Sequence, residues 1–361
     1  MRLKPWQTTW RRLAWTSAAA FLLTGCVTLP EARSVSCSRS AEPQVRVSED
    51  GHTASVEIDV LTYNVEGLGW PARTGRGRHL QAISDHLAEL HGRGEAPDIV
   101  LFQEVFSRSA ARAIGASSYP SLVAGPERNQ RRPRRDYSGL PGKRRPERGE
   151  IGFRVFSSGL VTVSTFPIVA SRSEPFPRAS CAGFDCLANK GMLLAEVAIP
   201  GVPGTLAVLN THMNAQRASR VSVRRHNAAH ARQVHALSRF LDSGISDQPA
   251  VLGGDFNMRS SEQRFEVFRT EQSLEIVHQY CTDHASLCEV ELSWDGDAPW
   301  MDTQDLQLFS SGGAVTVRPI RVEAMFDGAS EPKLSDHDGL RVTYELSWRT
   351  DTVVPPPPCS G

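Results

Sequence analysis

Apolar and polar positions alternate in a series of short segments, which is the pattern of half-buried β-strands. Residues 56–63, VEIDVLTY, alternate in this way and are rich in β-branched side chains. Residues 98–102, DIVLF, form a shorter apolar run of the kind that is buried on both faces. The same criteria predict further strands at 160–170, 192–199, 205–213, 249–254, 305–310, 315–324 and 340–347.

Two segments show helical spacing instead. In residues 79–91 the apolar positions recur every three or four residues, and residues 219–241 predict a longer helix. The predicted strands and helices follow one another without a linker, except at residues 127–148. We therefore expect one α/β domain over residues 55–348, with two sheets packed face to face and helices outside.

The two ends of the chain differ from this domain. Residues 26–54 are polar and aperiodic and are expected to be a tether, and residues 349–361 a proline-rich tail. Residues 1–25 combine a basic start with a short apolar stretch, which together form a secretory signal. Cys26 follows Leu-Thr-Gly, so the segment resembles a bacterial lipoprotein signal. That resemblance implies an exported protein with a lipid anchor on Cys26, held in the outer membrane and facing the periplasm or cell surface. A plain secretory signal is the alternative.

Export gives the cysteines a structural meaning. The sequence has seven, and a lipidated Cys26 leaves an even number in an oxidising compartment. Four of them form two close pairs, which we expect to be loop-closing disulfides: Cys181 with Cys186, and Cys281 with Cys288. Cys37 and Cys359 remain, and they would pair if the termini meet. A zinc site is disfavoured because no Cys-x-x-Cys motif occurs.

The charge is balanced overall but unevenly placed. Forty Lys and Arg face 40 Asp and Glu, and the chain is 40% hydrophobic, which excludes a disordered protein. Residues 127–148, here called the basic segment, carry nine basic and three acidic residues. Its three prolines discourage a helix, so we expect an exposed loop. Such a loop is either solvated surface or a contact for anionic lipid or nucleic acid.

Polar side chains follow several of the predicted strands and precede the last one. In chain order they are Asn64, Glu104, His212, Asp255, Asn257, Asp336 and His337. If these strands lie side by side, their ends meet at one rim of the sheets.

These residue types suit the hydrolysis of a phosphate ester. Asp255 could accept a proton from an attacking water, and His212 and His337 could stabilise charge on the phosphate or protonate a leaving oxygen. Mg²⁺ prefers hard oxygen ligands and keeps waters that a phosphate can replace. The candidate oxygen ligands are Glu104, Asp336 and Asn64.

Five strings in this order resemble the endonuclease/exonuclease/phosphatase superfamily. They are LTYNV at 61–65, FQEVF at 102–106, NTH at 210–212, GDFN at 254–257 and SDH at 335–337. The resemblance spans most of the chain. It implies a four-layered α/β sandwich, in which two mainly antiparallel sheets are flanked by helices, and a phosphohydrolase that depends on Mg²⁺ or Mn²⁺.

The resemblance also implies a role for each matched residue. Asn64 and Glu104 would hold the metal, and Asp255 would orient or deprotonate the water. Asn257 would position the nucleophile or the phosphate, and His337 would contact the transition state. Asp336 would support the metal or the histidine, and Asp305 would orient the last histidine. The family usually has an aromatic residue or His after that Asp, where this chain has Leu306.

Further strings, Ser158-Gly159-Leu160 and Asn189-Lys190-Gly191 among them, favour the neutral sphingomyelinase-like branch. Lys190 would reach a phosphate or be a solvated loop lysine. We therefore expect a monomeric phosphodiesterase acting on a phospholipid head group such as that of sphingomyelin. An exported nuclease and a non-catalytic binding module on the same fold are the alternatives. His226 and His230 lie four residues apart on the predicted helix, and such pairs are usually packed or solvated rather than metal ligands.

Overall fold

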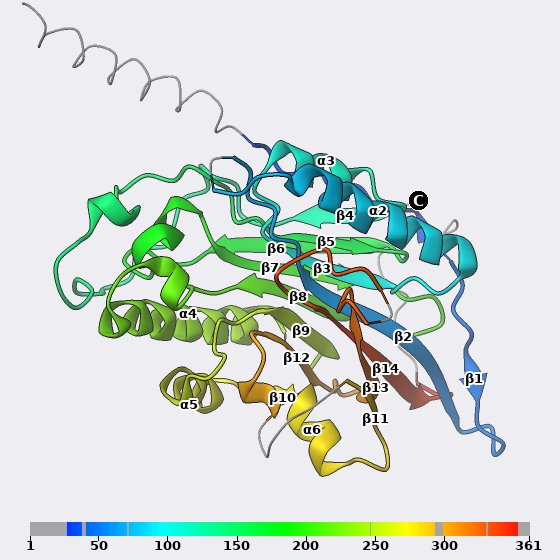
Figure 1. Cartoon of the computed structure of the whole chain (residues 1–361). Helices are drawn as coiled ribbons and strands as arrows, with labels where there is room; N and C mark the ends of the chain where they lie inside the picture. Colours follow the sequence, from blue (N-terminus) through cyan, green and yellow to red (C-terminus); the bar gives the residue numbers. More distant parts are fainter. Residues whose placement is uncertain are drawn as a thin grey trace, which may run out of the picture.

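In the computed structural model two β-sheets pack face to face between two layers of helices (Figure 1). The structure describes residues 27–37, 41–70, 72–245, 247–292, 299–329 and 331–352. The signal predicted for residues 1–25, the lipidation site Cys26, Cys359 and most of the predicted tail lie outside these residues. Within the described ranges, no helix is both long and apolar enough to span a membrane.

The first sheet has the strand order β11-β13-β14-β2-β3-β5-β4, and β1 pairs with β2 beside this path. Its strands are β1 (Arg46–Val47), β2 (Thr53–Asn64), β3 (Ile99–Gln103), β4 (Ser121–Ala124), β5 (Val161–Ser164), β11 (Glu289–Glu291), β13 (Thr316–Met325) and β14 (Gly339–Arg349). Only β2–β3 and β11–β13 are parallel pairs among these.

The second sheet has the order β10-β12-β9-β8-β7-β6. Its strands are β6 (Ile168–Pro175), β7 (Gly191–Val197), β8 (Leu206–His212), β9 (Ala250–Asp255), β10 (Glu275–Ile276) and β12 (Asp305–Ser310). Here β8 and β9 are parallel and the other pairs antiparallel. The expected sandwich of two mainly antiparallel sheets is therefore confirmed.

Helices cover the outer face of each sheet. The α-helices are α2 (Arg76–Arg93), α3 (Arg108–Gly115), α4 (Val223–Gly244), α5 (Glu262–Glu271) and α6 (Val277–Asp283), and the short 3₁₀ helices are η2 (Pro146–Arg148), η3 (Gly183–Leu187), η4 (Arg217–Ser219) and η5 (Pro299–Met301). Alternation along β2 explains the layering, because Ile58 faces the other sheet whereas Leu61 faces the helix layer of α2 and α3. On the second sheet, Leu209 likewise packs with Leu237 of α4.

The observed elements correct three sequence predictions. The two predicted helices are α2 and α4, but α3, α5 and α6 were not predicted. The strand predicted at 160–170 is two strands, β5 in one sheet and β6 in the other, with Pro167 between them. Proline cannot donate to a sheet ladder, which favours a break there. Part of the predicted tether packs on the domain, where Arg33 donates to the carbonyls of Gly115 and Tyr119.

Both predicted loop-closing disulfides are present, Cys181–Cys186 and Cys281–Cys288. Cys37 is disulfide-bonded as well, and both remaining cysteines of the sequence lie outside the described residues.

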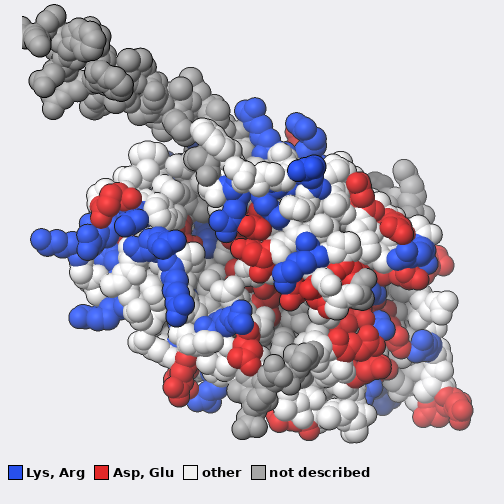
Figure 2. Space-filling view, viewed as in Figure 1, with Lys and Arg blue, Asp and Glu red and all other residues white. Residues whose placement is uncertain are grey.

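The basic segment is exposed, as expected, but it is held against α4 rather than free. Arg225 of α4 forms a paired contact with both carboxylate oxygens of Glu150, at 2.7 and 2.9 Å, and also donates to the carbonyls of Leu140, Pro141 and Gly142. Arg225 and Glu150 are both buried. Figure 2 shows the resulting surface, with Lys and Arg gathered on the left over this segment and Asp and Glu in the centre and on the right.

We predict that Arg225→Ala lowers the free energy of unfolding by about 3–5 kcal/mol, because it leaves the Glu150 carboxylate buried without its counter-charge. Denaturant titration measures the change. Arg224→Ala, an exposed neighbour on the same helix, is the matched control and should change stability by less than about 0.5 kcal/mol. Equal midpoints for the two variants would contradict the anchoring role of Arg225.

Candidate active site

Strand register places three of the predicted site residues side by side. His212 at the end of β8 pairs with Asp255 at the end of β9, and Asp255 pairs with Asp305 at the start of β12. Gly254 makes this close alignment possible, because a Cβ there would lie 2.1 Å from the carbonyl oxygen of Thr211. Adjacent strands of the second sheet therefore form one half of the rim.

The first sheet supplies the other half. Asn64 at the end of β2 donates to Asp255 across the sandwich at 3.1 Å, and its amide also bonds Glu104 just after β3. Glu104 has a φ of 62°, a left-handed conformation that is uncommon for this residue type. Gly67 packs on its backbone, since a Cβ there would lie 2.2 Å from the Glu104 carbonyl oxygen. The loop after β2 thus holds Glu104 in a strained conformation at the rim.

His337 is paired with Asp305 and faces Asp255. The contact between His337 Nδ1 and Asp305 Oδ2 is 2.5 Å, and His337 Nε2 lies 4.0 Å from Asp255 Oδ2. Burial lowers the pKa of His337, but the carboxylates of Asp305 and Asp255 outweigh it and raise the pKa to about 11. His337 is therefore a cation at neutral pH with Nε2–H directed toward the rim.

Asp255 lies at the centre of the cluster and is 2% exposed. Burial raises its pKa, His337 opposes this, and Asp305 adds to it, so that the pKa is about 7. The backbone N–H of Asn257 donates to Asp255 Oδ1 at 2.9 Å, and the Asn257 side chain donates to the carbonyl of Met213. A carboxylate with a pKa near neutrality is suited to accept a proton from water.

His212 and Lys190 form a buried contact beside Asp255, whose Oδ2 lies 3.3 Å from His212 Nε2. Lys190 Nζ lies 2.9 Å from His212 Nε2, and its other partners are the Asp185 carboxylate and the Met213 carbonyl. These three contacts use all three N–H groups of the ammonium, so Lys190 orients His212 here rather than pointing freely at a phosphate. Burial, followed by the charges of Lys190 and His337, lowers the pKa of His212 well below its ordinary value, so His212 is neutral.

The oxygen atoms at this rim suit a divalent cation. Burial raises the pKa of Glu104, the charges of Lys190 and His337 and the amide of Asn64 oppose the rise, and the carboxylate of Asp336 adds a smaller increase. Asp336 itself is half-exposed and lies 3.6 Å from Arg73. Ligand atoms of Asp255, Asp305 and His337 also lie within 4.8 Å of one another, but His337 Nδ1 is engaged by Asp305. The carboxylate and amide of Glu104 and Asn64 therefore fit a hard cation better.

Two buried arginines that the sequence did not single out hold the site loops. Arg264 of α5 donates to the carbonyls of Asn214 and Asn257, and Arg76 of α2 donates to the carbonyls of Val65 and Leu334. Neither arginine belongs to a recognisable motif, so no signal in the sequence indicated that Arg76 and Arg264 would bind the carbonyl oxygens of the site loops.

The helical His pair has structural partners. His226 contacts Arg264 at 2.7 Å, and His230 Nε2 contacts the carbonyl of Phe256 at 2.9 Å. Their packed role is as expected from the sequence.

Comparison with known proteins agrees with this arrangement. Residues 61–337 match the Endonuclease/Exonuclease/phosphatase family. No curated protein matches the chain.

Several solved structures share the fold at low identity. Sphingomyelinase C from Streptomyces griseocarneus is 20% identical with a TM-score of 0.56, covering 80% of this chain and 99% of that one. A Staphylococcus aureus beta toxin mutant with bound magnesium ions is 18% identical with a TM-score of 0.54, covering 80% and 99%. D. rerio TDP2 in complex with a single-strand DNA product is 15% identical with a TM-score of 0.51, covering 80% and 98%.

We predict that Asp305→Asn lowers the pKa of His337 from about 11 toward its ordinary 6.5, because the variant loses the carboxylate that favours the imidazolium. In the parent, this ion pair stabilises the fold fully below pH 6.5 and progressively less as the pH rises toward 11. NMR titration of the His337 ring measures the shift.

The exposed Asp302→Asn is the matched control and should leave the His337 titration unchanged. An identical titration of His337 in Asp305→Asn and the parent would show that Asp305 does not hold the proton on the ring.

Proposed function

The chain belongs to the endonuclease/exonuclease/phosphatase family, and we propose that it is a divalent-metal-dependent phosphodiesterase acting on a phospholipid head group of the sphingomyelin type. The observation that carries the proposal is the convergence of Asp255, with a pKa of about 7, and protonated His337 at one rim. These two groups have the opposite proton states that phosphodiester hydrolysis requires.

In this mechanism a water oxygen bonds to phosphorus while the bond from phosphorus to the leaving oxygen breaks. Asp255 takes the proton of the water, and its bonds from Asn64 and the Asn257 backbone fix the direction of the carboxylate. His337 directs its Nε2–H at the phosphate as charge grows there and gives that proton to the leaving oxygen, which departs as an alcohol. Its imidazolium is already in place, because Asp305 holds Nδ1 before the substrate binds.

We propose Mg²⁺ or Mn²⁺ as the cofactor, with Glu104 and Asn64 as its ligands and Asp336 at its edge. A bound cation would neutralise phosphate charge and polarise the phosphorus–oxygen bonds. The raised pKa of Glu104 supports this, because a carboxylate that burial has removed from water is stabilised by a bound cation.

The choice of a phospholipid head group is supported by the sequence strings around Ser158 and Lys190 and by the shared fold with sphingomyelinases. A nuclease is the second candidate, favoured by the basic segment and by the fold shared with TDP2, whose solved complex contains DNA. A silent binding module is disfavoured, since an inactive protein would not need the complete set of site residues.

We also propose that the protein is exported and held to a membrane by a lipid on Cys26, acting as a monomer. The motif at residues 23–26 supports this, as do the two disulfides, which persist in oxidising compartments.

We predict that Glu104→Gln weakens divalent-metal affinity and nearly abolishes turnover, because the variant loses the charged ligand at the end of β3. Initial rates against Mg²⁺ concentration, with calorimetric metal titration, measure both effects. Glu89→Gln, on the exposed face of α2, is the control and should behave as the parent. Full activity of Glu104→Gln in excess chelator would end the metal proposal.

A substrate panel tests the reaction itself. We expect the purified chain with Mg²⁺ to hydrolyse sphingomyelin, and a chromogenic phosphodiester more slowly, while leaving supercoiled DNA intact. Cleavage of DNA without lipid hydrolysis would replace the lipid assignment with the nuclease. If the folded protein hydrolyses no member of the panel, the non-catalytic binding module becomes the favoured function.

A further inference from the structure

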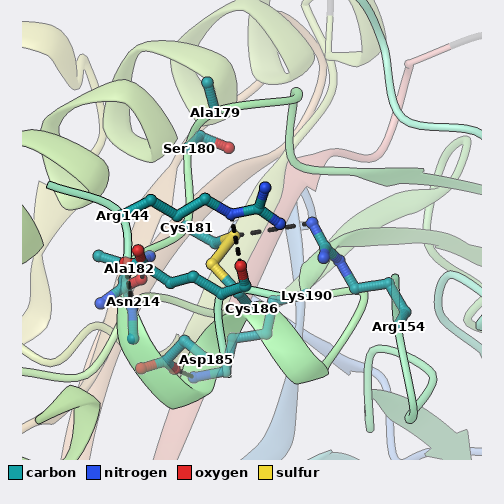
Figure 3. Close-up of a disulfide and its surroundings, with 12 residues drawn as sticks. Arg144, Arg154, Ala179, Ser180, Cys181, Ala182, Asp185, Cys186, Lys190 and Asn214 are labelled. Carbon is teal, nitrogen blue, oxygen red and sulfur yellow. Dashed lines mark hydrogen bonds and ion pairs between the residues drawn. A yellow bond between two sulfur atoms is a disulfide. The ribbon is translucent and has the colours of Figure 1, made fainter. Parts of the chain in front are cut away.

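Two arginines beside the basic segment have buried guanidinium nitrogens without acceptors. Arg132 Nε donates to Asn189 Oδ1 at 2.9 Å, but its Nη1 and Nη2 are enclosed and have no hydrogen-bond acceptor in the described part of the chain. Arg154 Nε is in the same situation, and its Nη2 reaches only the sulfur of Cys181 at 3.6 Å. Figure 3 shows Arg154 pointing at the Cys181–Cys186 disulfide.

The charges around Arg132 add to its excess of buried positive charge. Burial, followed by the positive charges of Arg154 and Arg178, lowers the pKa of Arg132 well below its ordinary value. Removing a charge from water is costly unless a counter-charge and hydrogen bonds replace the solvent. Other buried arginines of this chain meet that condition, since Arg225 faces Glu150 and Arg264 is surrounded by carbonyl oxygens. Arg132 is thus an exception that an anionic ligand would resolve.

The geometry favours a phosphate group as that ligand. A guanidinium edge offers two parallel N–H groups, which match the oxygens of phosphate, and both terminal nitrogens of Arg132 lack an acceptor among the described residues. Arg178 is exposed, and its backbone bonds Pro133, so it lies where the cluster opens to solvent. Among the described residues these three arginines form no ion pair with an acid, and such a set of cations suits a group with more than one negative charge.

The cluster of Arg132, Arg154 and Arg178 is connected to the catalytic rim by residues that contact both. Asn189, which orients Arg132, directly precedes Lys190, the partner of His212. Asp185, which also binds Lys190, belongs to the loop closed by the disulfide that Arg154 contacts. Asp185 and Lys190 appear close to that disulfide in Figure 3. A ligand bound by Arg132 would therefore be connected to the catalytic rim through Asn189 and Lys190 rather than through Asp255 or His337.

We propose that Arg132, Arg154 and Arg178 form a second phosphate-binding site, separate from the site of the scissile phosphate. This second-site proposal depends on the proposed function only for the choice of phosphate as the anion. The phosphate is either an additional phosphate on a substrate more highly phosphorylated than sphingomyelin or free inorganic phosphate, and the experiment separates the two sources.

The first arm measures thermal unfolding of the full chain, without metal, in sodium phosphate and in sodium chloride at equal ionic strength. The parent should be stabilised by phosphate, and Arg132→Met should lose that response. Arg131→Met, an exposed neighbour in the same segment, should keep it. His337→Ala should also keep it, because the proposed site lies outside the catalytic centre. Arg154→Met provides the same test should Arg132→Met fail to fold.

The second arm compares two chromogenic phosphodiesters, one of which carries an additional phosphomonoester. A KM for that substrate raised about ten- to a hundredfold in Arg132→Met, with the plain diester unaffected, would assign the site to the substrate. Unchanged KM values together with loss of the phosphate response would assign it to free phosphate.

Equal unfolding of the parent in phosphate and chloride, or an undiminished response of Arg132→Met, would overturn the proposal. A phosphate response lost in His337→Ala but retained in Arg132→Met would overturn it too, since the anion would then occupy the catalytic centre. The stability arm needs no turnover, so it remains informative if the proposed function fails.

Discussion

Buried side-chain amides fix how the two sheets lie on one another, and the candidate site depends on that alignment. Asn210 of β8 donates to the carbonyls of Phe102 and Val161 in the opposite sheet, and Gln103 donates to Asn210 Oδ1 at 2.9 Å. Gln307 of β12 donates to the carbonyls of Val60 and Leu340 in the same manner. Each of these groups would cost roughly 1–3 kcal/mol if left buried and unpaired, so sliding of the sheets is resisted. Asn64 can reach Asp255 only because the sheets cannot slide.

Electrostatics divides the face that carries the site. The carboxylates of Glu104, Asp255 and Asp305 gather at the rim, where low exposure raises the pKa of the first two. On the surface, Lys and Arg gather on the left over the basic segment, and Asp and Glu are more frequent in the centre and on the right (Figure 2). The proposed cation and anion sites would thereby lie apart, since a metal prefers carboxylates and a phosphate prefers guanidinium groups.

Loop strain is a second feature of the site. Glu66, Glu104 and Asn257 all have positive φ angles, between 48° and 62°. Such conformations persist only where the surroundings over-determine them. Arg76 bonds the carbonyl of Glu66, and Arg264 bonds that of Asn257. These buried guanidinium groups replace missing backbone partners and so hold the loops in shapes that their sequences alone would not favour.

Much of this protein could be predicted from its sequence. Alternation along residues 56–63 indicated a strand, and the order of Asn64, Glu104, Asp255 and His337 indicated the family, because local periodicity and contiguous motifs are properties of the chain itself. The Cys pairs were equally readable from their short separation. The break at Pro167 was missed because an apolar run does not reveal in which sheet each half will pair.

Only the tertiary structure decided which charges meet. The sequence contains many arginines with similar neighbours along the chain. In the structure Arg225 pairs with Glu150 and Arg264 donates to carbonyl oxygens, whereas the terminal nitrogens of Arg132 are enclosed without an acceptor among the described residues. The pKa values of Asp255 and His337 likewise depend on burial and on partners from distant strands. Coulomb forces and desolvation act through space, so their balance is set once the sheets have packed and cannot be read from neighbours along the chain.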